Sequence, residues 1–143
     1  MSDLLPREAF RVVEPIAVRW GDMDAYEHVN NAAFLTYCES ARITYFETVD
    51  LFDHVDDKNG PVVVEVRCAF LRQVHYPANL EVGAKASQIG RSSFTLEYGI
   101  FDTADGDRVA EGSSVVVWID RKAGRSHSLP TSLVERIRAL DLS

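Results

Sequence analysis

One stretch of the chain, from Asn31 to about Val49, has the spacing of an amphipathic helix. Its apolar residues recur at intervals of three and four, and neither Gly nor Pro interrupts them. These residues are Phe34, Tyr37, Cys38, Ala41 and Tyr45. Asn30 or Asn31 is expected to cap the amino end, because an Asn side chain accepts hydrogen bonds from the unpaired N–H groups there. A helix face this apolar needs an equally apolar surface to cover it.

The segments around this helix alternate between apolar and polar residues with a period of two, which is typical of half-buried strands. The predicted strands are residues 10–20, 61–71, 80–89, 93–101 and 107–120, with a polar loop at 53–60 and a short helix from about Thr131 to Leu140. Short turns join the last four strands, so the sheet should be antiparallel. The pattern therefore predicts an α+β fold, a long central helix wrapped by a five-stranded antiparallel sheet, in a single domain of residues 1–143.

The charge balance and the cysteines exclude several classes of protein. Fifteen Lys and Arg stand against twenty-two Asp and Glu, a net charge of −7, so no nucleic-acid partner is expected. No apolar run reaches about 18 residues and no apolar leader precedes the domain, which predicts no membrane span and a cytoplasmic location. Cys38 and Cys68 lie in apolar patterns without CxxC spacing and should be reduced core thiols. No P-loop or GxGxxG is present, and no cofactor is expected.

A polar stretch, GDMDAYEHVNN at residues 21–31, separates the first predicted strand from the helix. Its possible metal ligands are Asp22, Asp24, Glu27 and His28, but the spacing of an EF-hand is absent and no metal is expected. Side-chain turns and a helix cap would account for Asp22 and one asparagine. A second interpretation is chemical: a helix amino end stabilises an oxyanion, and a carboxylate that faces it would complete a minimal site for acyl transfer.

The run VRWGDMDAYEHVNNAAFLTYCESAR at residues 18–42 resembles the signature of the 4-hydroxybenzoyl-CoA thioesterase family. That signature reads approximately D-x-D-x-x-G-H-V-N-N and continues into an apolar helix that ends E-x-x-R. The resemblance extends over nearly the whole chain and implies a hotdog fold, in which a curved antiparallel sheet wraps one long helix. It also implies a homodimer or homotetramer with active sites at subunit interfaces, and hydrolysis of an acyl-CoA or acyl-carrier-protein thioester.

The resemblance assigns roles to residues of the polar stretch. Asp24 matches the catalytic carboxylate, which acts on the thioester either as a nucleophile or as a base for water. The backbone amide of Asn31 would polarise the thioester oxygen. His28 and Asn30 match positions that orient the substrate, the water or Asp24 itself. Apart from the motif, Tyr26 is expected either to lie in the core or to line the wall of the acyl pocket, where it would bind substrate.

Two other acidic residues of the stretch have different expectations. Asp22 should brace the loop. Glu27 stands where the family has Gly, so a positive φ there would strain the backbone by about 1 kcal/mol. Glu27 also adds a carboxylate that could itself act as the base.

Coenzyme A is a polyanion, and an acidic protein must hold it with a few well-placed cations. Arg91, Ser92 and Ser93 follow Gly90 in a predicted turn and are expected to contact the CoA phosphates or pantetheine. The rival cationic cluster is Arg121, Lys122 and Arg125.

Two alternatives to a thioesterase stay open at this point. A hotdog hydratase or dehydratase would need an Asp–His or His–Glu pair across its site. A non-catalytic acyl-CoA-binding hotdog protein would have no need for Asp24. The acyl group, whether aromatic, short-chain or medium-chain, is left open by the sequence.

Overall fold

The computed structural model describes residues 4–142. Its strands are β1 (Val12–Ala17), β2 (Asn59–Phe70), β3 (Asn79–Ile89), β4 (Ser93–Asp102), β5 (Arg108–Asp120) and the short β6 (Arg125–Ser126). Its helices are α1 (Asn31–Thr48) and α2 (Thr131–Ile137), with single 3-10 turns at Arg7–Ala9, Trp20–Asp22 and Leu51–His54 and a π turn at Arg138–Leu142. In the described part of the chain, no helix is long and apolar enough to cross a membrane.

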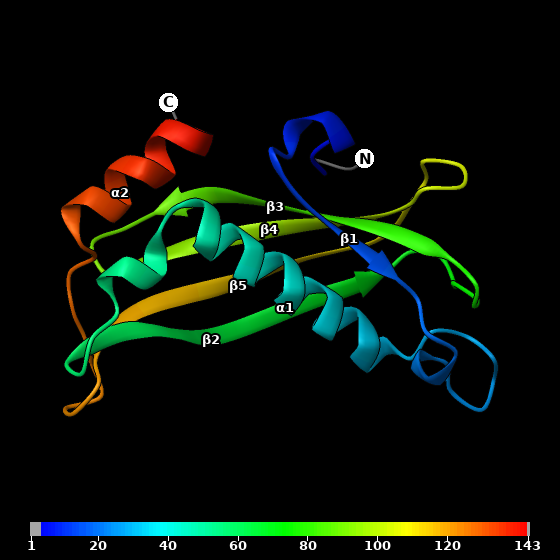
Figure 1. The fold of residues 1–143 in the computed structure, drawn as a ribbon, viewed down its shortest axis with the longest axis horizontal. Helices are drawn as coiled ribbons and strands as arrows, with labels where there is room; N and C mark the ends of the chain where they lie inside the picture. The colour runs from blue at the N-terminus through cyan, green and yellow to red at the C-terminus, as the bar shows by residue number, and fades with distance from the viewer. Residues whose placement is uncertain (1–3, 143) are drawn as a thin grey trace.

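The strands form one antiparallel sheet in the order β1-β3-β4-β5-β2, and β6 adds to β5. The sheet curls around α1, which lies across its concave face (Figure 1). The predicted five-stranded antiparallel sheet, long central helix and short terminal helix are therefore confirmed, and the two-residue β6 is the addition. The first strand is shorter than predicted, because the chain turns into a 3-10 helix at Trp20.

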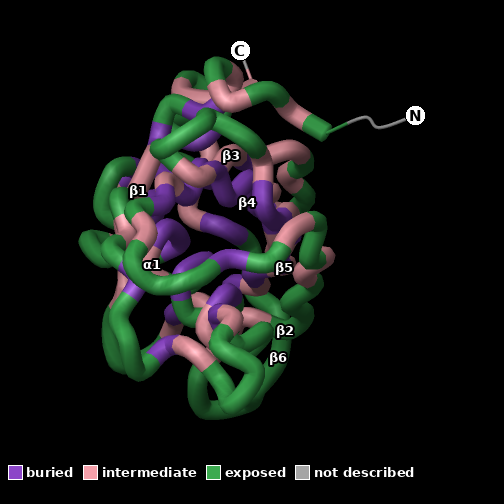
Figure 2. Tube along the Cα trace, turned by 90° about the vertical axis from the view of Figure 1, so that its right-hand side faces the viewer, coloured by how far each residue is buried: buried purple, intermediate pink, exposed green. Residues whose placement is uncertain are grey.

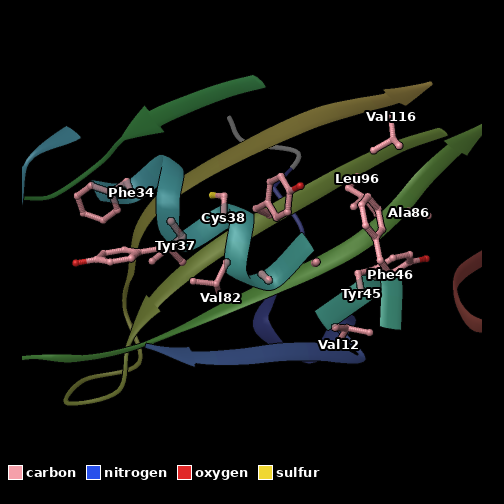
Figure 3. Close-up of a cluster of buried hydrophobic side chains, with 14 of the residues drawn as sticks. Val12, Phe34, Tyr37, Cys38, Tyr45, Phe46, Val82, Ala86, Leu96 and Val116 are labelled. Carbon is pink, nitrogen blue, oxygen red and sulfur yellow. The ribbon is translucent and has the colours of Figure 1, made fainter. Parts of the chain in front are cut away.

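The apolar face predicted for the helix is the centre of the core. Phe34, Tyr37, Cys38, Ala41 and Tyr45 are all at most 4% exposed. They pack with inward residues of the strands, as Figure 3 shows, and buried segments of the helix and the sheet meet in the middle of the molecule (Figure 2). Burying one such side chain contributes about 1.5–3 kcal/mol, so this helix holds the sheet in its curled form.

The stretch predicted as a polar loop at residues 53–60 is partly ordered. Leu51, which precedes it, is buried and starts a 3-10 turn that ends at His54. Strand β2 then begins at Asn59, two residues before the predicted strand. The turn forms because burial of Leu51 fixes the chain directly after the helix.

The two edges of the sheet differ. Edge strand β1 contains Pro15, which has no N–H to offer to a further strand. Edge strand β2 is 12 residues long, and its Val64, at a β-bulge, is 59% exposed. Exposed apolar side chains continue from this strand onto the helix. They are Val62, Val64, Val66, Leu35 and Ile43. A long apolar edge of this kind is normally paired with another chain.

Candidate active site

The polar stretch forms a tight loop held by its own hydrogen bonds. The Asp24 N–H donates to the His28 carbonyl at 2.9 Å, and the Glu27 N–H donates to the Asp24 carbonyl at 3.0 Å. The Asp24 side chain accepts from the Tyr26 N–H at 2.8 Å, which is an Asx turn. Glu27 has φ 66°, the left-handed conformation that the missing Gly would have adopted without strain. The positive φ considered for this position is therefore present, and Glu27 holds it at a cost of about 1 kcal/mol.

Asp22 connects this loop to the helix and to the strand before it. Its carboxylate, with a side chain only 5% exposed, accepts hydrogen bonds from the Arg19 backbone and guanidinium and from the Tyr37 hydroxyl. Burial alone would raise the pKa of Asp22, but the hydrogen bonds from Arg19 and Tyr37 outweigh it and lower the pKa. Burial and the bond to Asp22 raise the pKa of Tyr37. These contacts are those of a residue that braces the loop.

The amino end of α1 is capped in a way that leaves one backbone donor unused. Asn30 is the cap, since its side-chain oxygen accepts from the Ala32 N–H at 2.9 Å, and its own N–H donates to the Asp22 carbonyl. Among residues 4–142 no acceptor receives a hydrogen bond from the Asn31 N–H. A helix amino end carries a partial positive charge, so this N–H is a ready donor to an oxyanion.

Four of the predicted site residues line one pocket of about 640 Å³ beside this helix end. They are Asp24, Tyr26, His28 and Asn31, and the remaining walls are Val29, Phe34, Phe70, Leu71, Arg72 and Gln73. Asp24 is exposed to the pocket, and Tyr26, 81% exposed, stands at its rim. Asp24, which carries a carboxylate, and Asn31, which carries the unpaired helix N–H, thus line one pocket, and these are the two groups of a minimal acyl-transfer site.

One wall of the pocket is apolar. Phe34 from α1 and Phe70 from the end of β2 pack with ring centroids 5.5 Å apart, and Leu71 is 51% exposed beside them. Exposed apolar groups next to a carboxylate offer a surface for the apolar part of a substrate.

The sequence did not identify the pocket residues at the end of β2 and directly after it. The alternation at 61–71 predicts a strand, but only the fold brings Phe70 and the following residues 71–73 against the polar loop. Arg72 looks like a phosphate ligand, yet its guanidinium is within 3.2 Å of three carboxylates. These are Asp102, Asp105 and Asp107, and they neutralise its charge.

Arg91, Ser92 and Ser93 do not reach this pocket within one protomer. They form the turn between β3 and β4, where Ser93 is level with Val117 on β5 and Val117 is level with Val62 on β2. Val62 is eight residues from Phe70 along β2, or about 25 Å at the rise of a strand. The predicted CoA-binding turn therefore lies near the far end of the sheet from Asp24.

The rival cations lie at that same end. A pocket of about 350 Å³ is lined there by Lys58, Asn59, Asp120, Lys122, Ala123 and His127. Arg121 lies beside this pocket, since its backbone N–H donates to the Lys58 carbonyl. The turn at Arg91 is close by, because the Leu129 N–H donates to the Arg91 carbonyl two residues after His127. Both predicted cationic groups thus lie at one end of the molecule, called the basic end below, which also carries Asp120.

Metal-ligating and thiol side chains do not form a second site in the described part of the chain. Among residues 4–142 no group of three or more His, Cys, Asp and Glu could hold a metal ion. Cys38 and Cys68 are unbridged. The pKa of the Cys38 thiol is raised by its hydrogen bond with Cys68 and by burial, which makes it a poor nucleophile.

Comparison with known proteins gives the family. The sequence profile of the thioesterase-like superfamily matches residues 18–137. The long-chain acyl-CoA thioesterase FadM of Escherichia coli is 29% identical over 126 residues, which cover 87% of this chain and 96% of FadM.

Two solved structures match over almost their whole length. A thioesterase from Thermus thermophilus, complexed with coenzyme A and Zn, is 36% identical with a TM-score of 0.81 and covers 94% of this chain and 97% of its own. The PA5185 protein of Pseudomonas aeruginosa is 31% identical with a TM-score of 0.82 and covers 95% and 96%. These matches confirm the hotdog fold. The chain belongs to the thioesterase-like superfamily and is a thioester hydrolase.

Proposed function

We propose that the chain hydrolyses acyl-CoA thioesters, or the equivalent thioesters of acyl carrier protein, at the pocket that contains Asp24 and Asn31. The observation that carries the proposal is that the Asp24 carboxylate and the unpaired Asn31 N–H line one pocket of about 640 Å³ with an apolar wall. FadM, whose substrates are long-chain acyl-CoAs, is similar over 87% of this chain. We include in this proposal that the chain belongs to the narrower 4-hydroxybenzoyl-CoA thioesterase family, whose signature the motif at residues 18–42 resembles.

The chemistry follows from the positions of the two groups. In one route an Asp24 oxygen attacks the thioester carbon, the C–S bond breaks, and water then hydrolyses the resulting anhydride. In the other route Asp24 takes a proton from a water molecule while the oxygen of that water attacks the thioester carbon. The C–S bond then breaks, and Asp24 returns the proton to the leaving thiolate. Both routes pass through an oxyanion that accepts a hydrogen bond from the Asn31 N–H. Both end in a free acid and a thiol.

His28 and Asn30 have supporting roles in this proposal. His28 lines the pocket, and its carbonyl accepts the Asp24 N–H, so it holds the backbone from which the carboxylate extends. Asn30 holds the first turn of α1 and so aims the Asn31 N–H. Tyr26, which lines the same pocket and is largely exposed, would contact the substrate.

We further propose that two copies pair through β2 to complete the site. The exposed apolar strip of Val62, Val64, Val66, Leu35 and Ile43 supplies the surface. In an antiparallel pair about the middle of β2, the Asn59 end of one strand lies beside the Phe70 end of the other. The basic end of one copy then meets the Asp24 pocket of the other. A homodimer would therefore bring Arg91, Ser92 and Ser93, with Arg121, Lys122 and Arg125, to the phosphates of a CoA whose thioester lies at Asp24.

Thiol release tests the proposed function. The purified protein is incubated with a panel of acyl-CoAs and acyl carrier proteins that carry aromatic, short, medium and long acyl groups, and the thiol is followed with a colorimetric reagent. We expect at least one substrate to give equal amounts of thiol and free acid. Binding without thiol release across the panel would make the chain an acyl-CoA-binding protein, and hydration of a 2-enoyl-CoA without thiol release would make it a hydratase.

A further inference from the structure

We propose that His75 is a positioning residue for this reaction: its imidazole holds the Asp24–His28 loop in its working conformation from outside the loop. The inference rests on the proposed function, because it assumes that Asp24 does the chemistry. His75 lies in the segment between β2 and β3, about fifty residues from the loop in sequence, and no motif points to it.

The segment that contains His75 runs along the loop and is bonded to it at three points. The Val29 N–H donates to the Val74 carbonyl at 2.8 Å, and the Tyr76 N–H contacts the Met23 sulfur at 3.4 Å. Between these two backbone contacts, Nδ1 of His75 lies 2.9 Å from the Glu27 carbonyl oxygen. His75 thus supplies the side chain by which the segment joins a continuous seam with the loop.

The His75 contact fixes the place where the loop is most strained. Glu27 is left-handed, with φ 66°, and a residue with a side chain keeps this conformation only when its surroundings impose it. The Glu27 N–H is bonded within the loop, to Asp24, whereas its carbonyl is bonded to His75. The Glu27 carbonyl belongs to the peptide group that joins Glu27 to His28. A hydrogen bond to this carbonyl therefore fixes the orientation of that peptide group and the position of His28.

The two imidazoles also touch. The rings of His28 and His75 have centroids 4.7 Å apart at 64°, an edge-to-face contact. His28 lines the Asp24 pocket, while His75 lines a neighbouring pocket that does not include Asp24. His75 therefore acts through Glu27 and His28 and has no direct contact with the proposed reaction centre. A displacement of a catalytic group by about 1 Å can cost about a hundredfold in rate, so a residue at this distance can control turnover.

The hydrogen bond defines the state of the His75 ring. A carbonyl oxygen only accepts, so Nδ1 must carry the proton. Two variants can therefore test the hydrogen bond and the ring contact separately. His75→Asn keeps an N–H donor near the position of Nδ1 but removes the ring, and His75→Phe keeps the ring but removes the donor.

The first experiment compares steady-state kinetics of these two variants on one acyl-CoA. We expect His75→Phe to lower kcat by about five- to tenfold, the effect of a lost hydrogen bond, with KM within twofold of wild type. His75→Asn should recover most of the lost kcat. His54→Phe is the matched control, because His54 bonds to Ser132 beyond the carboxyl end of α1, whereas the loop precedes its amino end. The kcat of this variant should stay at the wild-type value.

Two further readouts separate positioning from general stability. Nitrogen NMR at pH 8.5, where a free imidazole is neutral, should show His75 with its proton on Nδ1. In a Glu27→Gly background the left-handed turn is no longer strained, so the kcat loss from His75→Phe should shrink to less than twofold.

Wild-type kcat in His75→Phe, or equal loss in the Phe and Asn variants, overturns the inference. A proton found on Nε2 also overturns it. Asp24→Asn measured beside them keeps the two proposals apart. If Asp24→Asn is inactive and His75→Phe is not impaired, only the role of His75 fails. If Asp24→Asn is fully active, the proposed function itself fails.

Discussion

The hydroxyl of Tyr37, on the second turn of α1, donates a 2.7 Å hydrogen bond to the buried carboxylate of Asp22 in the loop before the helix. The same carboxylate binds Arg19, and the Asp22 carbonyl accepts the N–H of the cap residue Asn30. One aspartate thus joins the end of the first strand segment, the loop and the helix. Asp24, two residues later, lines the pocket instead. The two aspartates of the motif therefore differ in their surroundings, and the proposal gives the chemistry to the exposed one.

Asp22→Asn should lower the free energy of unfolding by about 1–3 kcal/mol, because a buried charged acceptor with several donors is replaced. The pKa of Asp22 is lower in the folded chain than in the unfolded chain. The stability that the ionised carboxylate contributes is therefore complete above the unfolded pKa and is lost as the pH falls through the folded pKa. Denaturant unfolding at pH 7 and pH 3 checks this. The stability difference between wild type and Asp22→Asn should be large at pH 7 and smaller at pH 3, and an equal difference at both would contradict the account.

Asn30→Ala removes the side-chain cap of α1. We expect a loss of about 0.5–2 kcal/mol in unfolding free energy and a fall in kcat, because the Asn31 N–H is no longer held in place. Asn30→Asp keeps an acceptor for the Ala32 N–H and serves as the control. It should retain the stability of the wild type. If Asn30→Ala loses stability but keeps the wild-type kcat, the amino end of α1 has no part in catalysis.

Val64→Lys places a charge on the exposed apolar edge of β2. The wild type should be at least a dimer in light scattering at micromolar concentration, and Val64→Lys should shift it towards monomer, because the unpaired edge would then carry a cation. Thr95→Lys, on the outward face of a central strand, is the control and should leave the β2 pair intact. A wild-type monomer would contradict the proposed pairing.

Arg91→Ala should raise KM for acyl-CoA several-fold with little change in kcat, because a phosphate contact holds the ground state and the transition state alike. The effect should shrink at high salt. An unchanged KM would move the contact to Arg121, Lys122 and Arg125.

Hybrid dimers then show which copy supplies the cation. A mixture of Asp24→Asn and Arg91→Ala chains should contain one intact site per hybrid, if Asp24 and Arg91 come from different copies. Half of the wild-type activity at the wild-type KM would therefore appear in the hybrid. Activity only at the raised KM would place both residues in the same protomer.

Much of the fold could be predicted because its signals are local. The spacing of apolar residues from Phe34 to Tyr45 predicts the helix, and the period of two predicts each long strand. The predicted end of the first strand was wrong, since hydrogen bonds between Arg19 and Asp22 close a 3-10 turn at Trp20. A turn held by individual side-chain and backbone contacts leaves no period in the sequence.

The same distinction applies to the site. Asp24, His28 and Asn31 lie within eight residues, so one motif could predict that they meet, and the structure places them on one pocket. His75 and Phe70 reach that loop only through the curl of the sheet. The separation of Arg91 from Asp24 within a protomer follows from strand register, which alternation alone does not specify.

Turnover by Asp24→Asn tests the central claim most directly. The substitution keeps the shape of the side chain and removes its charge, so kcat should fall by roughly 10²–10⁴, the range for loss of a positioned base, while the protein stays folded and still binds acyl-CoA. Glu27→Gln, three residues along the same loop, should keep most of the activity. Full activity in Asp24→Asn together with its loss in Glu27→Gln would contradict the account and would place the chemistry on Glu27.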